Sequence, residues 1–102
     1  MRNFKLIVEY DGAAYCGWQR QKNGISIQQI LDEAIALIVC EKVTLIGSGR
    51  TDAGVHAINQ VANFKSSTLL PAEKIFRGVN SVLPQDIVVK SLNEVHVDFH
   101  AG

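Results

Sequence analysis

Residues 25–38 have the sequence Ile-Ser-Ile-Gln-Gln-Ile-Leu-Asp-Glu-Ala-Ile-Ala-Leu-Ile, which is the clearest helix signal in the chain. Ser26 is the expected N-cap, because its hydroxyl can accept the backbone N–H of Gln29, whose side chain can reach back in a capping box. Ile25 and Ile30 are spaced as a hydrophobic staple across this helix start. The stretch predicts an amphipathic helix whose apolar face carries Ile27, Ile30, Leu31, Ala34, Leu37 and Ile38.

Strand-like and loop-like segments precede this helix. In residues 4–10, apolar side chains alternate with polar ones, which is the period of a strand with one buried face: Phe4, Leu6, Val8 and Tyr10. Residues 11–24 contain Gly12, Gly17 and Gly24 and show little periodicity. A loop of this length is usually functional when it is ordered.

The second half of the chain repeats the pattern of strands and a helix. Residues 43–49 and 58–64 predict two strands that form a hairpin around a turn at residues 50–55. Pro71 is the expected first position of a second helix that ends before Pro84, and Gly78 inside it costs about 1 kcal/mol. Residues 86–92 predict a fourth strand.

The predicted order is strand, helix, strand, strand, helix, strand. This order indicates an α+β fold of the ferredoxin-like, split βαβ type (βαββαβ), with a four-stranded antiparallel sheet and two helices on one face. No predicted element covers the other face of the sheet. Side chains on that face should meet solvent, a ligand, or another domain or subunit.

Length and composition limit the function classes. The chain has 102 residues, 47% of them hydrophobic, and its ten Lys and Arg balance ten Asp and Glu. One folded domain is expected, and the zero net charge weighs against a self-sufficient nucleic-acid-binding domain. The longest apolar run, residues 34–40, is too short to cross a membrane, and no secretory signal is recognisable. We expect a cytoplasmic protein without a membrane partner, in which Cys16 and Cys40 are free thiols.

Residues 47–56, Gly-Ser-Gly-Arg-Thr-Asp-Ala-Gly-Val-His, are the densest functional candidate. Three glycines allow tight backbone paths around one acid, Asp52, and one base, Arg50. A dinucleotide-binding fingerprint is excluded because the third glycine and the following helix are missing, and no Walker phosphate loop is present. Taken alone, Asp52 has two interpretations: a turn cap that accepts backbone N–H bonds, or a catalytic carboxylate.

Four separate segments, in the right order, resemble the tRNA pseudouridine synthase A family. The segment from Gly49 to Ala57 looks like the family signature that contains its catalytic Asp, at position 52 here. The opening motif is similar in residues 10–12, in Tyr15 and in residues 17–21, and two further matches are residues 78–87 and residues 98–101. The resemblance covers essentially the whole chain.

The resemblance implies an isomerase that converts uridine to pseudouridine in the anticodon stem-loop of tRNA. The glycosidic bond must break, the uracil must rotate, and C5 must join C1′, which a carboxylate can assist without a metal or an organic cofactor. Asp52 would attack C1′ or C6, or stabilise a cationic or glycal-like intermediate. Because the target base must leave its stack first, Arg50 is expected to extrude the base or hold a phosphate, and Thr51, inside the signature, is expected to contact substrate.

Three other residues have competing interpretations. His56 contacts RNA or is simply hydrogen-bonded at the start of a strand. Trp18 stacks on RNA beside the cation Arg20, or it anchors the long loop to the sheet. The three histidines share no ligand spacing with a cysteine, so we expect no metal site.

The resemblance also implies that residues 1–102 form the N-terminal ferredoxin-like half of a two-half enzyme whose second half is absent from this chain. The second half would supply a tyrosine that stacks on the uracil and a basic partner for Asp52. We therefore expect this chain to be inactive alone, to bind tRNA weakly, and to expose a partly apolar sheet face, while the intact enzyme forms a homodimer. Two alternatives stay open: a non-catalytic RNA-binding module, and a small-ligand regulatory domain.

Overall fold

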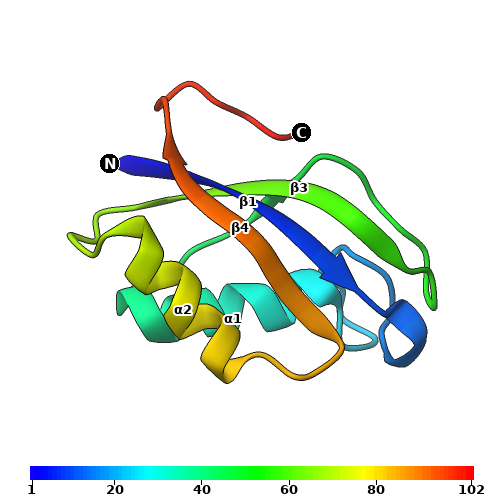
Figure 1. Ribbon diagram of the computed structural model, residues 1–102. Helices are drawn as coiled ribbons and strands as arrows, with labels where there is room; N and C mark the ends of the chain where they lie inside the picture. The colour runs from blue at the N-terminus through cyan, green and yellow to red at the C-terminus, as the bar shows by residue number, and fades with distance from the viewer.

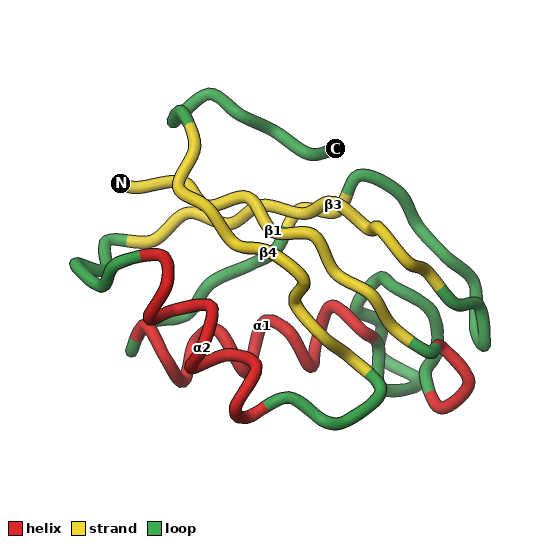
Figure 2. Tube along the Cα trace, in the orientation of Figure 1, coloured by secondary structure: helices red, strands yellow, loops and turns green.

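The computed structural model describes residues 1–102 and confirms the predicted order of elements (Figure 1). Along the chain these elements are β1 (Arg2–Tyr10), the short 3-10 helix η1 (Gly12–Ala14), α1 (Ile27–Val39), β2 (Ile46–Gly47), β3 (Ala57–Ser66), α2 (Ala72–Val82) and β4 (Ile87–Val95). Both helices lie on one face of the sheet (Figure 2). The fold is the ferredoxin-like α+β fold expected from the sequence.

The sheet has the strand order β2-β3-β1-β4, and all neighbouring strands are antiparallel. The predicted hairpin of β2 and β3 is present, but the second strand is much shorter than residues 43–49. Val43 and Leu45 are buried in the core without pairing to a strand. The Leu45 N–H instead donates to Oδ1 of Asp32 on α1 at 2.9 Å, so this segment follows the helix before it joins the sheet.

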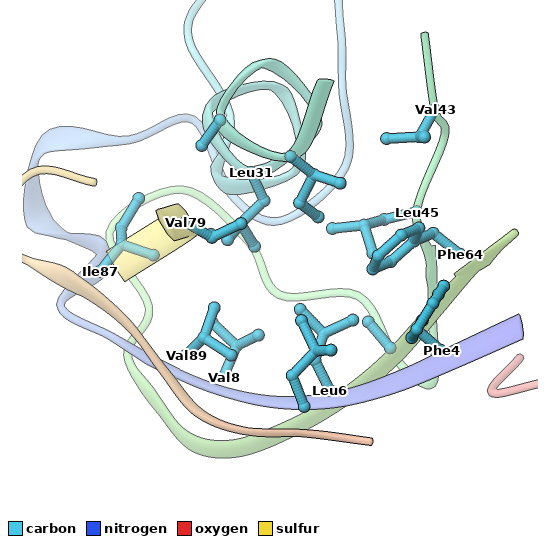
Figure 3. Close-up of a cluster of buried hydrophobic side chains, with 14 of the residues drawn as sticks. Phe4, Leu6, Val8, Leu31, Val43, Leu45, Phe64, Val79, Ile87 and Val89 are labelled. Atoms are coloured by element: carbon cyan, nitrogen blue, oxygen red, sulfur yellow. The ribbon is translucent and has the colours of Figure 1, made fainter. Parts of the chain in front are cut away.

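The core lies between the helices and the inner face of the sheet (Figure 3). The alternating side chains of β1 predicted to be buried are all at most 3% exposed. Phe4 stacks on Phe64 of β3 with ring centroids 5.2 Å apart, and Leu6 lies between Ala62 and Leu92 in the register. Strand period and burial therefore agree along the centre of the sheet.

Helix α1 begins where predicted, because Ser26 is its N-cap and its Oγ accepts the Gln29 backbone N–H at 3.1 Å. The predicted return contact is absent, since the Gln29 side chain points to Glu33 instead. Ile25 is 53% exposed and Leu37 is 66% exposed, so neither belongs to the buried face. Packing rotates that face toward Leu31, Ile35 and Val39, a rotation that spacing alone does not fix.

Helix α2 begins one residue later than predicted. Pro71 is its N-cap, with an extended ψ of 149°, and the helix ends before Leu83 and Pro84 as expected. Gly78 has a packing reason: a Cβ at this position would lie 3.0 Å from the Ile38 side chain of α1. The glycine lets the two helices approach closely.

The other face of the sheet is partly covered by the segment after β4, which turns back across it (Figure 1). Asn3 and Asn63 are buried on this face and hold the segment: the Asn3 amide donates to the carbonyls of His96 and Phe99, and the Ala101 N–H donates to Asn63. The rest of the face is exposed or half-buried and partly apolar, as expected, with Ile7, Val61, Val88 and Val95 among polar side chains. None of the helices has the length and apolar character needed to span a membrane.

Candidate active site

The glycine-rich loop, defined here as residues 48–56, connects β2 to β3 and contains Asp52. At its start, the Ser48 N–H donates a hydrogen bond to the Val61 carbonyl of β3 at 2.8 Å, which continues the pairing of the hairpin. The side chain of Gln60 donates to the Gly49 carbonyl at 2.6 Å and extends the hairpin by one contact. Beyond Gly49 the loop makes no further hydrogen bond to β3, and apart from one bond within the loop its remaining hydrogen bonds are with other segments.

The segment at residues 10–18, called here the supporting segment, holds the far part of the loop. The hydroxyls of Tyr10 and Thr51 are 2.7 Å apart. The backbone N–H of Trp18 donates to the Thr51 carbonyl at 3.1 Å, and the Gly54 N–H donates to the Tyr15 carbonyl at 3.2 Å. The two segments, remote in sequence, are thus joined backbone to backbone.

Two glycines of the supporting segment are required by this close approach. A Cβ at Gly12 would overlap the carbonyl oxygen of Val55, and a Cβ at Gly17 would overlap that of Thr51. Gly17 also has a φ of +84°, which only glycine adopts without strain. Glycines that looked like ordinary loop residues in the sequence are therefore contact points with the glycine-rich loop.

Asp52 and Arg50 are both exposed on this loop. They line an open depression of about 470 Å³ together with their neighbours Thr51 and Ala53. The opposite part of the lining comes from the segment before α1: Cys16, Gln19, Arg20 and Gln21. The structure thus brings together four of the six predicted site residues, namely Arg50, Thr51, Asp52 and Arg20. A carboxylate that shares an open depression with two arginines can meet a polyanionic substrate and act on an electrophilic carbon.

Arg20 is also a partner of the buried Asp32. Its guanidinium lies 3.3 Å from Asp32 Oδ2, while its side chain stays 48% exposed. Burial raises the pKa of the Asp32 carboxyl, and the Leu45 N–H and Arg20 oppose that rise. Arg20 therefore links α1 to the edge of the depression while about half of its side chain stays exposed.

The structure favours the anchoring interpretation of Trp18 over the RNA-stacking one. Trp18 is 3% exposed, and its ring packs on Tyr10 with centroids 6.0 Å apart. Its ring is too deeply buried for a base to stack on it. The physical reason is that the supporting segment folds back over the end of β1, so the indole completes the core instead of facing solvent.

His56 is exposed and hydrogen-bonded, as the simpler interpretation expected. The Gly12 N–H donates to its Nδ1 at 2.9 Å, which places the proton of the neutral ring on Nε2. Nδ1 also lies 3.1 Å from Oδ1 of Asp11. His56 lies outside the depression that holds Asp52 and faces a neighbouring one, whose lining includes Glu9 and Asp86.

Sequence reasoning missed the supporting roles of Tyr10, Tyr15 and Asp86. The Tyr15 hydroxyl donates to Asp86 Oδ1 at 2.6 Å, and burial, followed by this bond, raises the Tyr15 pKa to about 12. The Asp86 carbonyl also accepts the Asp11 N–H at 2.9 Å. All three residues lie in the segments that resemble the family, which marked them as candidates for a role. No spacing rule indicated which residues their side chains contact.

The fold and the loop together define a ferredoxin-like domain that presents a carboxylate from a glycine-rich hairpin connection. A family model described as tRNA pseudouridine synthase matches residues 6–102. The chain belongs to the tRNA pseudouridine synthase family.

Curated relatives agree with this family assignment. The chain is 54% identical over 101 residues to tRNA pseudouridine synthase A of Thermoanaerobacter sp. (strain X514), which covers 99% of this chain and 41% of the relative. It is 54% identical over 100 residues to the protein of the same name from Citrifermentans bemidjiense, covering 98% and 40%. The corresponding protein of Clostridium acetobutylicum is 50% identical over 101 residues, covering 99% and 41%. The chain spans about two fifths of the length of these relatives.

Proposed function

We propose that this chain is the N-terminal, Asp52-bearing half of a tRNA pseudouridine synthase that isomerises uridine to pseudouridine in the anticodon stem-loop. The observation that carries the proposal is the exposed Asp52 carboxylate, held on the glycine-rich loop beside Arg50 and Arg20 in one depression. Family membership supports the reaction class. The depression is open, which suits a substrate as large as a folded RNA.

Asp52 supplies the reactive group. Its carboxylate attacks C1′ or C6 of the target nucleotide, or stabilises the cationic or glycal-like species formed when the glycosidic bond breaks. Arg50 is two residues away, exposed, and suited to hold a phosphate or to take the place of the extruded base. Neither role requires a metal or an organic cofactor.

A second half completes the site. The chain corresponds to about two fifths of the length of its relatives, and the depression around Asp52 is wide open to solvent. The zero net charge of this chain fits an arrangement in which the other half supplies much of the positive charge that tRNA requires. The chain by itself is therefore inactive and binds tRNA weakly.

The partly apolar outer face of the sheet is a candidate interface in the intact enzyme. Ile7, Val61 and Val88 offer an apolar surface to a second half or a second subunit. We propose that the intact enzyme is a homodimer and that it acts in the cytoplasm. Sedimentation of the intact enzyme tests the dimer, and a monomer at micromolar concentration contradicts it.

The experiment uses the two-half enzyme, meaning this chain joined to a second half, either its own or the C-terminal part of the Thermoanaerobacter relative. Tritium release from C5-labelled uridine in tRNA measures the reaction. Asp52→Asn removes the nucleophile at constant shape, and turnover should fall by more than about 10³-fold while tRNA binding persists. Glu73→Gln, which changes an exposed carboxylate on α2, is the matched control and should keep full activity.

Each remaining outcome is decisive. Full activity in Asp52→Asn removes Asp52 from the chemistry. If the unmodified two-half enzyme binds tRNA without releasing tritium, the RNA-binding module replaces the isomerase. Binding of a small molecule with no affinity for tRNA favours the regulatory domain instead.

A further inference from the structure

Tyr10 is the last residue of β1, and its side chain contacts the glycine-rich loop. Its side chain is 3% exposed, yet its hydroxyl reaches Oγ1 of Thr51 at 2.7 Å. Thr51 immediately precedes Asp52. The two hydroxyls therefore connect the central sheet to the residue next to the carboxylate, across 41 positions of sequence.

Tyr10 is held rigidly. It lies in a central strand and is paired with Ala57 of β3 on one side and with Ile87 of β4 on the other. Its ring packs on Trp18 with an interplanar angle of 29°. With backbone and ring both fixed, the phenolic oxygen has little freedom, and the hydrogen bond transmits the position of the sheet to Thr51.

Asp52 has no comparable support of its own. It is exposed, its side chain makes no hydrogen bond within the chain, and its carbonyl accepts only the Val55 N–H at 3.2 Å. Thr51, by contrast, is held twice, through its hydroxyl by Tyr10 and through its carbonyl by the Trp18 N–H. The place of the Asp52 carboxylate thus depends on how Thr51 is fixed.

We propose that Tyr10 is a positioning residue for the reaction: through the Thr51 hydroxyl it fixes the Asp52 carboxylate relative to the target nucleotide. The inference rests on the proposed function and deepens it. A reacting carboxylate must lie within a few tenths of an ångström of its productive place, and small displacements reduce the rate steeply. Tyr10 is too deeply buried to touch substrate, so its effect on the reaction passes through the loop.

Two conservative variants of the two-half enzyme test this role. Tyr10→Phe keeps the ring and its packing on Trp18 and removes only the hydroxyl, and Thr51→Val removes the partner hydroxyl at nearly constant volume. Thr68→Val is the matched control, because its hydroxyl bonds only locally, to the Leu70 N–H, far along the chain from the glycine-rich loop. Trp18 fluorescence and circular dichroism check that each variant is folded.

We expect Tyr10→Phe and Thr51→Val each to lower the single-turnover rate by about 10- to 100-fold. In Tyr10→Phe, whose side chain is buried away from substrate, the tRNA dissociation constant should change less than about twofold. The double variant should lose no more than the worse single variant, because both remove the same bond. The shape of the rate–pH profile should be unchanged and only its height reduced. Thr68→Val should keep the full rate.

The proposal is overturned if both variants keep the full rate, if their losses multiply in the double variant, or if the loss in Tyr10→Phe appears in tRNA binding instead of turnover. Should Tyr10→Phe fail to fold, Thr51→Val decides alone. The experiments distinguish failure of the positioning role of Tyr10 from failure of the proposed function. An enzyme that needs Asp52 but not the Tyr10 hydroxyl refutes only the positioning role, whereas an enzyme indifferent to Asp52→Asn refutes the proposed function.

Discussion

Replacing Gly17 by Ala should destabilise the chain far more than replacing Gly54 by Ala, although the two glycines have nearly the same backbone conformation. Gly17 has a φ of +84° and Gly54 a φ of +80°. A Cβ at Gly17 would lie closer than 3.0 Å to the Thr51 carbonyl oxygen and 3.2 Å from the Asp52 carbonyl carbon, while a Cβ at Gly54 meets nothing within 4 Å. The pair therefore separates backbone strain from steric overlap.

Both variants carry the cost of a left-handed residue with a side chain, about 1–2 kcal/mol. Gly17→Ala must also push the glycine-rich loop away, and overpacking of this kind costs about 1–3 kcal/mol. Displacement of Thr51 breaks its bond from the Trp18 N–H, which contributes about 0.5–1.5 kcal/mol. The free energies of unfolding of the two variants should then differ by about 1.5–4.5 kcal/mol.

Urea denaturation of the 102-residue chain measures this difference, with the fluorescence of Trp18, the single tryptophan, as the reporter beside circular dichroism. In the two-half enzyme, Gly17→Ala should also reduce turnover, since it moves the residue next to Asp52. Gly54→Ala should affect turnover much less. Unfolding free energies of the two variants within about 0.5 kcal/mol of each other would refute the view that the loop is seated directly on Gly17.

Two further predictions concern the core and the supporting segment. Phe64→Ala, which empties a fully buried site in the sheet, should lower the free energy of unfolding by about 3–5 kcal/mol in urea, and a loss below about 1 kcal/mol would contradict the packing described here. Tyr15 keeps its proton to a higher pH in the folded chain, where its pKa is about 12, than in the unfolded chain, where it is near 10. Its contribution to stability is therefore fully present below pH 10 and is lost as the pH rises from about 10 to 12. Because Tyr15 is partly exposed, the loss should not exceed about 1 kcal/mol, and it should vanish in Tyr15→Phe. The same dependence of stability on alkaline pH in the two proteins would exclude ionisation of Tyr15 as the cause of the loss.

Local signals in the sequence predicted the elements well. The start of α1 depends on one short-range bond from Gln29 to Ser26, and the alternation in β1 depends on the two faces of a single strand. Motif spacing also identified Asp52 and Arg50 as a candidate site. These features lie within a few residues of one another, so the chain itself specifies them.

Features that depend on how one element packs on another were predicted less well. Whether Leu37 is exposed depends on the rotation of α1 against α2 and the sheet, and whether Trp18 faces solvent depends on how an aperiodic loop folds over β1. The short pairing of β2 follows from the bond between Leu45 and Asp32. None of these contacts leaves a periodic pattern in the sequence.

The sequence by itself therefore determined the order of the elements, because that order depends on residue type at short spacing. Its resemblance to a known family, carried by four segments along the chain, implied that Asp52 is the candidate nucleophile. Only the tertiary structure decided how that nucleophile is held. The contacts of Thr51 with Tyr10 and Trp18 join positions more than thirty residues apart, and the overlap that forbids a side chain at Gly17 exists only when the two loops meet. Such contacts form when the sheet brings the ends of β1 and β2 together, and no local rule of sequence encodes which atoms then touch.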